Sequence, residues 1–416
     1  MVYNIFKFLK GGGIMYESPE QRRQARQQKR HLAKKRRWRL IGIGLSVLAA
    51  IGLVVLLVHF LKPSADPNPT GTTAPPPPNT VIHYAAVGDL NINDVTVGSG
   101  DYSKVFQDIA HLLADADISS VNFEGSFAGG PYGSTGSAPT SLAEAMADMG
   151  VDLVQLANSY AINRGLSGLV SSIDTVSAAG MTPLGVYRTN REFQSQKGYI
   201  IREVSGIRMA FAAFTKGMDG MALPAGSEDC VNVLYEDYDS VYQKINREKI
   251  TGILSNIKKE QPDIVIALLH WGSEFNDTLS ESQNSIVKLM QENGVDAIIG
   301  THPHYVQKMT LNKETGQFVA YSLGDFYSDG VRAGSEYSVV LDLEITKNGL
   351  TGEVKITDFG YTPIFSVHEA GKPSRVMRIL QAVEAYQNNH IDKVTKQTYE
   401  DMLYALQRIE ARIQGE

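Results

Sequence analysis

The sequence has a single cysteine and only two tryptophans among its 416 residues. One cysteine, Cys230, cannot form an intramolecular disulfide and cannot build a zinc site of the cysteine-rich kind. Any metal ion would therefore have to be held by histidine, aspartate, glutamate or asparagine. Apolar residues are not scarce: they make up 43% of the chain, which excludes a wholly disordered protein.

Positive charge is scarce outside the N-terminal segment. Residues 1–39 hold 12 Lys and Arg against two Glu, and Lys62 adds one further base. Residues 63–416 are left with 26 bases and 43 acids, a net charge of −17. A body with this balance is not expected to bind nucleic acid.

One long apolar run follows the basic N-terminal segment. Residues 40–58 contain no charge and one weakly polar member, Ser46, and the apolar character continues to residue 61. A helix of this length spans about 28 Å, close to the hydrocarbon thickness of a bilayer. We expect 40–61 to be a transmembrane anchor, with the basic tail 1–39 cytoplasmic and the rest of the chain outside the cell. A cleaved signal peptide is the alternative, disfavoured by the length and late start of the run.

The remainder divides into a spacer and a folded body. Residues 62–80 are rich in proline, with four consecutive prolines at 75–78, which predicts an extended linker. From residue 81 short apolar runs alternate with amphipathic stretches, which is typical of an α/β domain with a buried sheet. The expected strands are 82–87, 118–122, 152–156, 182–186, 209–214, 264–269 and 297–299, and the expected helices 103–114, 140–149, 166–179, 238–260 and 280–292. Beyond residue 304 we expect antiparallel strands at 306–310, 318–322, 338–345 and 353–362, then terminal helices within 366–416 that pack on the domain.

Polar side chains stand where the expected strands end. Because the carboxyl ends of parallel strands meet at one edge of a sheet, we expect these side chains to lie together. Taken singly, each has an ordinary structural explanation, such as a helix cap or a buried histidine. Together, a mixed oxygen and nitrogen set without sulfur predicts a divalent metal site suited to Mn, Zn or Fe. The residues are Asp89, Glu124, Asn158, Ser159, His270, His302 and His304.

Seven sequence runs carry a resemblance to a known family. They are VGDLNIND (87–94), NFEGSF (122–127), LANSYAINRG (156–165), LGVYR (184–188), LLHWGSEF (268–275), IIGTHPHYVQ (298–307) and YSLGDF (321–326). In this order they resemble the capsule-synthesis CapA family, which is related to the calcineurin-like metallophosphoesterases. The resemblance implies a four-layer α/β/β/α sandwich over residues 81–365 with its site at the sheet edge. It also implies a bacterial role linked to an extracellular anionic polymer, typically poly-γ-glutamate.

By this resemblance Asp89, Glu124, His270, His302 and His304 match the metal-site positions. One run departs from the family pattern, which is close to Ala-Asn-Asn-His-x-x-Asp. Here Ser159 replaces the amide ligand, Tyr160 replaces the imidazole expected to be catalytic, and Asn163 replaces the acid. A tyrosine of ordinary pKa, near 10, is a poor general acid at neutral pH. Asp325 stands where the family has asparagine, and so returns a carboxylate to the neighbourhood.

Candidate ligand-binding residues lie on the same expected edge. Arg164, Arg188 and Lys216 follow strands and are of the type that holds carboxylates or phosphates. Asn158 and Asp325 are further candidates. Three functions stay open: a surface protein in the synthesis, export or retention of an envelope polymer, an extracellular metal-dependent phosphoesterase, and a binding module without catalysis. The partners expected are the membrane and the polymer or its synthesis complex.

Overall fold

The computed structural model describes residues 76–369, 374–389 and 394–415. Residues 76 to 416 form one compact unit. The predicted tail and anchor, and the linker up to residue 75, lie outside the described residues. Within the described ranges, no helix combines the length and the apolar character that crossing a membrane requires.

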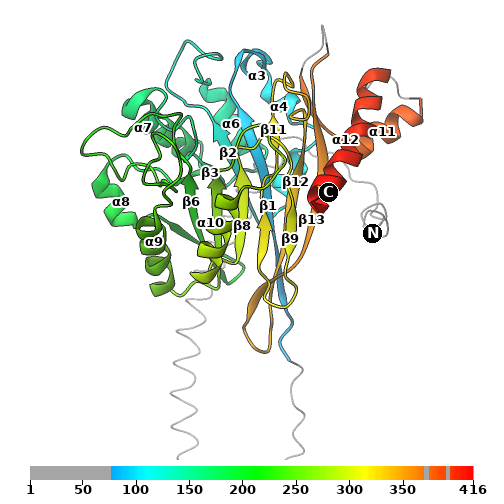
Figure 1. Ribbon diagram of the computed structural model, residues 1–416. Helices are drawn as coiled ribbons and strands as arrows, with labels where there is room; N and C mark the ends of the chain where they lie inside the picture. The colour runs from blue at the N-terminus through cyan, green and yellow to red at the C-terminus, as the bar shows by residue number, and fades with distance from the viewer. Residues whose placement is uncertain (1–75, 370–373, 390–393, 416) are drawn as a thin grey trace, which may run out of the picture. The chain divides into compact units, whose positions relative to one another are not determined.

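Two β-sheets form the centre of the body (Figure 1). The first runs in the order β14-β13-β12-β1-β2-β3-β4, with β11 paired beside β1. Its strands are β1 (Thr80–Asn91), β2 (Ile118–Glu124), β3 (Leu153–Gln155), β4 (Thr182–Leu184), β11 (Asp325–Tyr327), β12 (Tyr337–Lys347), β13 (Val354–Val367) and β14 (Arg375–Arg378). The second runs β5-β6-β7-β8-β10-β9. Its strands are β5 (Ile200–Val204), β6 (Ile207–Thr215), β7 (Ile264–His270), β8 (Ala297–Thr301), β9 (Met309–Leu311) and β10 (Phe318–Ala320).

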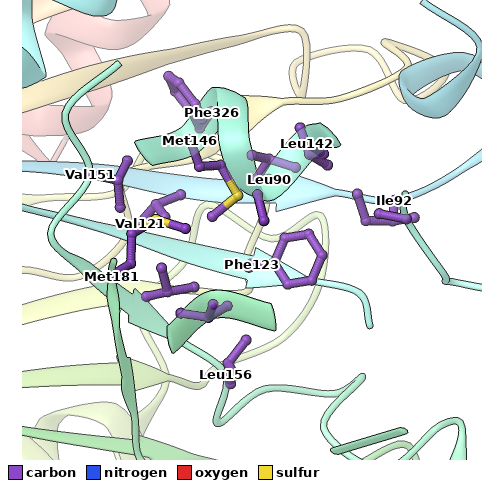
Figure 2. Packing of buried hydrophobic residues seen from close by; sticks show 14 of the residues in the cluster. Leu90, Ile92, Val121, Phe123, Leu142, Met146, Val151, Leu156, Met181 and Phe326 are labelled. Atoms are coloured by element: carbon purple, nitrogen blue, oxygen red, sulfur yellow. The ribbon is translucent and has the colours of Figure 1, made fainter. Parts of the chain in front are cut away.

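Alternating side chains along each strand separate the layers. Tyr84 and Ala86 of β1 belong to the apolar cluster between the sheets, together with Phe211 of β6. The neighbouring residues Ala85 and Val87 face the opposite side, because successive strand residues point to opposite faces. That side is covered by α6 (Thr140–Asp148) and α7 (Gly165–Ala178). Figure 2 shows Leu142 and Met146 of α6 directed at the sheet face that carries Leu90, Val121 and Phe123.

The outer face of the second sheet is covered in the same way. A third apolar cluster joins its strands to α9 (Arg247–Lys259) and α10 (Glu281–Glu292). The order is therefore helix, sheet, sheet, helix, so the predicted four-layer α/β/β/α arrangement is confirmed. The shorter helices are α3 (Asp94–Gly98), α4 (Tyr102–Val105), α5 (Ala110–Ala114) and α8 (Asn190–Gln196).

The C-terminal segment packs on the body. It holds α11 (Ile379–Gln387) and α12 (Lys396–Gln414), which bury Ile379, Met402 and Ile409 in the cluster between the sheets. In Figure 1 these two helices, drawn in red, lie beside β13 and on the side away from α8 and α9. β14 precedes them and pairs with β13, so this segment is not helical throughout.

Two of the predicted helices are wrong in part. The helix expected over 238–260 begins only at Arg247, because the Asp237 carboxylate accepts the backbone N–H groups of Gln243 and Lys244 and folds 237–244 into a turn. Asn246 then caps α9 by accepting the N–H of Lys249. The stretch 103–114 forms two short helices, α4 and α5, rather than one.

Two of the later strands also differ from the prediction. β10 pairs in parallel with β8 and extends the second sheet, while it is antiparallel to β9 alone. β11, which was not predicted, pairs in parallel with β1. This second pairing decides the composition of the site described next.

Candidate metal centre

Asp89 and Asp325 are neighbours because β1 and β11 pair at those two residues. Each aspartate follows a glycine, and Gly88 allows the two backbones to approach closely. A Cβ on Gly88 would lie only 1.7 Å from the carbonyl oxygen of Gly324, so no other residue fits at position 88 without movement. The Asp89 N–H donates to that same oxygen at 3.0 Å.

The first donor group consists of Asp89, His304 and Asp325, all buried. His304 Nδ1 lies 2.7 Å from Asp325 Oδ1 and 3.7 Å from Asp89 Oδ2. Asp89 is fixed by the backbone N–H of His302 at 2.9 Å and by Asn122 Nδ2 at 2.6 Å. The two histidines flank Pro303 with φ angles of 91° and 59°, a left-handed conformation that bulky residues rarely adopt.

The second donor group consists of Glu124, His270 and His302, also buried. Glu124 Oε1 lies 2.6 Å from His270 Nε2, and the rings of His270 and His302 are 4.3 Å apart. Asn122 contributes here too, since its Nδ2 donates to Glu124 Oε1 at 3.3 Å. One amide therefore holds a carboxylate of each donor group, which places the two groups side by side.

The hydrogen bonds of His270 indicate that a proton or a cation is needed between this histidine and Glu124. The Thr215 hydroxyl donates its only hydrogen to the Gly217 carbonyl, so it must accept from His270 Nδ1–H, 3.1 Å away. The lone pair of His270 Nε2 then points at a Glu124 oxygen, which is also an acceptor. Two acceptors at 2.6 Å repel one another unless a proton or a cation lies between them.

Electrostatics lead to the same requirement. Burial, with the charge of neighbouring carboxylates, raises the pKa of Asp89 to about 8, and burial raises the pKa of Glu124 to about 8. Burial lowers the pKa of His270 to about 3, whereas Asp325 holds the pKa of His304 well above its usual value despite burial. Clustered buried carboxylates are costly without a compensating cation. The donor set therefore fits a divalent metal ion.

The loop after β3 brings Asn158, Ser159 and Tyr160 to the same edge. Asn158 Nδ2 donates to Asn122 Oδ1 and to the Phe123 carbonyl, and Asn158 Oδ1 accepts the Tyr160 N–H. Asn158 therefore positions the loop, while Ser159 is buried beside it. Burial and the charge of Glu124 raise the pKa of Tyr160, which makes its phenol a weaker acid still.

The three predicted basic residues lie at different distances from the two donor groups. Lys216 reaches the second donor group, with Nζ 3.1 Å from His302 Nε2. Arg188 does not reach either group, because its guanidinium pairs with Asp174 and Glu192 at 2.6 and 2.7 Å. Arg164 stands half-buried at the N-cap of α7, outside both donor groups.

Several residues of the edge were missed by the sequence analysis. Thr215 ends β6 and orients His270, and the rule that selected polar residues at strand ends would have found it. Asn122 opens the run NFEGSF, and the Asn91 side chain lies near enough to Asp325 to lower the pKa of that carboxyl, against the effect of burial. Glu274 is exposed but lies close enough to His302 and His304 to share an ion with them.

Phe275 and Arg332 form the rim above His304, and neither was predicted. The Phe275 ring stacks on His304 with 4.9 Å between centroids, and its N–H donates to the Pro303 carbonyl. Phe275 has a φ of 52°, so a bulky residue is held in the left-handed region at the mouth of the site. The Arg332 guanidinium lies 5.2 Å above this ring. Nothing in the sequence pattern marks this pair, since both residues sit in loops.

Comparison with known proteins gives relatives from two bacilli. The chain is 25% identical over 284 residues to the capsule biosynthesis protein CapA of Bacillus anthracis, covering 65% of this chain and 66% of that protein. It is 26% identical over 223 residues to the PGA biosynthesis protein CapA of Bacillus subtilis (strain 168), covering 54% and 53%. The chain therefore spans less than two thirds of the length of either relative.

Solved structures similar to this chain include a phosphoesterase and a phosphatase. One is the calcineurin-like phosphoesterase YfkN from Bacillus subtilis, with 17% identity, coverage of 79% of this chain and 100% of that one, and a TM-score of 0.45. Another is a phosphatase from Mycoplasma pneumoniae, with 14% identity, coverage of 69% and 94%, and a TM-score of 0.44.

The family comparison covers most of the body. The model of the bacterial capsule synthesis protein family PGA_cap matches residues 81–330, which is more than half of the chain. The matched range contains the runs from VGDLNIND to YSLGDF that suggested the resemblance. The predicted family is thereby confirmed, and the chain belongs to the bacterial capsule synthesis family PGA_cap.

Proposed function

We propose that this protein is a membrane-anchored surface protein that binds an anionic envelope polymer of the poly-γ-glutamate type through a divalent ion. It would act in the synthesis, export or retention of that polymer. Family membership supports a role in capsule formation, and one relative is named for PGA biosynthesis. Mn, Zn or Fe suits the mixed carboxylate and imidazole donors.

The observation that carries the proposal is the excess of acid at the edge of the sheets. Asp89, Glu124 and Asp325 are buried there, and the exposed Asp219 and Glu274 add negative charge that acts on Glu124. A polyanion would be repelled by this edge as it stands. When bound, a divalent ion supplies the positive charge that holds and polarises a carboxylate or phosphate oxygen.

Arg332 at the rim and Tyr160 on the loop after β3 have side chains that could orient such a polymer. Arg332 is exposed and lies over the Phe275 ring, which itself stacks on His304. Its guanidinium could therefore bind a polymer carboxylate close to the first donor group. Tyr160 offers a phenolic hydroxyl that stays protonated, because burial and Glu124 raise its pKa. A group of this kind donates a hydrogen bond well and gives up its proton poorly. These features favour binding over cleavage.

The sequence before residue 76 supports the anchored part of the proposal. A basic cluster directly before the apolar run 40–61 favours a cytoplasmic N-terminus, and the proline-rich linker would carry the body away from the outer face of the membrane. Protease added to intact cells should remove the body while an N-terminal tag stays protected. Protection of both ends would refute this topology.

The central experiment measures polymer binding by the purified full-length chain. We expect poly-γ-glutamate to bind in the presence of Mn²⁺ and to be released by a chelator, while uncharged dextran does not bind. Arg332→Ala should weaken binding about 10-fold, the value of roughly one charge-assisted contact. Arg191→Ala, which removes an exposed arginine of α8, is the matched control and should change nothing. Binding that persists unchanged after chelation would contradict the proposal.

The same preparation tests the phosphoesterase alternative. The Mn²⁺-loaded chain should hydrolyse a generic aryl phosphate no faster than a metal solution alone, because Tyr160 cannot serve as an effective acid. Sustained turnover that depends on the donor residues would replace the binding proposal by an enzymatic one.

A further inference from the structure

Lys216 has an unusual environment for a lysine. Its Nζ donates to the Gly272 carbonyl at 3.0 Å, lies 4.7 Å from the centre of the Tyr242 ring, and approaches His302 Nε2 to 3.1 Å. Among the described residues Lys216 forms no ion pair; burial lowers its pKa, and the more distant charges of Glu274 and Asp219 oppose that shift. The side chain is therefore held by a carbonyl, an aromatic face and an imidazole of the second donor group.

The contact with His302 determines what that imidazole can still do. A neutral imidazole has one lone pair and one N–H. If the lone pair is on Nε2, the Lys216 ammonium occupies it, and Nδ1 carries the hydrogen. If the lone pair is on Nδ1, then Nε2–H meets the ammonium with two donors opposed at 3.1 Å. The opposed donors disfavour the second tautomer, and in the first His302 has no lone pair left for a metal ion while the charged Lys216 stays in place.

In the first donor group no ammonium from the described part of the chain approaches a ligand atom, and His304 pairs with Asp325 through Nδ1, which leaves Nε2 for an ion. Asp89 and Asp325 provide two carboxylates beside His304, and the nearest hydrogen-bond donors to Asp89 are the neutral Asn122 amide and the His302 backbone N–H. The second group has one carboxylate, Glu124, which contacts His270, while the Lys216 ammonium contacts the other histidine of the group, His302. The positive charge that each group needs therefore has a different source.

We propose that Lys216 is the resident cation of the second donor group and that the site takes one divalent ion, held by Asp89, His304 and Asp325. This inference rests on the metal-dependent site of the proposed function. It assigns Lys216 a role as a fixed charge rather than a direct contact to the polymer.

The experiment counts ions and does not depend on activity. The full-length chain is freed of metal with a chelator and titrated with Mn²⁺ by calorimetry, and the bound metal is then counted by elemental analysis. We expect one Mn²⁺ per chain in the wild type and a second, weaker site in Lys216→Met, because that change frees His302. Lys249→Met is the matched control. Lys249 lies on α9, is also largely buried and forms an ion pair with Asp229, so its loss should leave the number of bound ions at one.

The outcomes separate this inference from the proposed function. Two ions in the wild type, or one ion in Lys216→Met, would overturn the role of Lys216 and leave the metal site standing. No ion in the wild type would overturn both. Lys216→Gln provides a second neutral variant, and circular dichroism establishes that each variant is folded before its ions are counted.

Discussion

The two donor groups of the site are built from the same kinds of side chain, yet they are compensated differently. The first has two carboxylates, from Asp89 and Asp325, and Asp325 accepts a hydrogen bond from its histidine and raises the pKa of that imidazole despite burial. The second has one carboxylate, Glu124, two histidines that burial keeps neutral, and Lys216 against one of them. The comparison shows that a cluster of metal-type residues is not by itself a count of metal ions. The hydrogen bonds that each side chain already makes decide which of its atoms remain free to bind a metal ion.

The largest loss of stability and of metal binding should come from disrupting the close backbone contact between Gly88 of β1 and Gly324, which precedes β11. Only the first donor group depends on this contact. Gly88→Ala places a Cβ 1.7 Å from the Gly324 carbonyl and must push β1 and β11 apart. We expect a loss of about 3 kcal/mol in stability, or roughly 5–10 °C in thermal unfolding, together with loss of the ion. Gly98→Ala is the control, because its Cβ meets nothing within 4 Å. Similar melting temperatures for the two variants would show that this contact does not position the aspartates.

The next effect separates the two histidines that flank Pro303. His304→Ala should lower Mn²⁺ affinity at least ~100-fold, because it removes a ligand of the first group. His302→Ala should lower it less than about threefold, since its backbone N–H still donates to Asp89. Calorimetric titration of both variants measures the difference. Equal losses would mean that the two groups share the ion and that the comparison is wrong.

A smaller effect concerns pH and the metal-free protein. Between pH 6.5 and 8 the folded state retains protons on Asp89 and Glu124, whose pKa values are raised to about 8, and on His304, whose pKa is also raised. The unfolded chain has lost those protons, so stability should fall as pH rises through this window. Below pH 6.5 the lowered pKa values of His270 and His302 act in the opposite direction.

Thermal unfolding from pH 6.5 to 8, with and without Mn²⁺, tests this prediction. The metal-free melting temperature should drop by a few degrees, and the stabilisation by Mn²⁺ should grow with pH because the ion replaces the protons. A metal-free melting temperature that rises over the same range would contradict the assigned protonation states.

The smallest effect should come from Tyr160. Tyr160→Phe removes only the hydroxyl, and because burial and Glu124 raise its pKa, no proton transfer is expected to depend on it. Mn²⁺ affinity should stay within about twofold and stability within ~0.5 kcal/mol. A change in the pH profile of any aryl phosphatase activity would instead place the phenol in a reaction.

Much of the architecture followed from local sequence patterns. Apolar runs located the buried strands β1, β2, β6, β7 and β8, because a strand covered on both faces must be apolar over several residues. The prediction for 238–260 was wrong over its first part, since the turn at Asp237 depends on hydrogen bonds that periodicity does not reveal. The family resemblance was readable from motifs whose order survives even where single positions, such as Ser159 and Tyr160, have changed.

The sequence by itself determined which chemistry is available: acids and imidazoles at strand ends, no sulfur ligand, and an acidic body behind a basic, apolar N-terminal segment. Only the tertiary structure decided which of these residues meet. The pairing of β1 with β11 joined Asp89 to Asp325, and the same fold turned Arg188 toward Asp174 while it brought Lys216 to His302. The reason is that side-chain type is local, whereas the partner that takes a lone pair or a charge is fixed by packing between segments far apart in the chain.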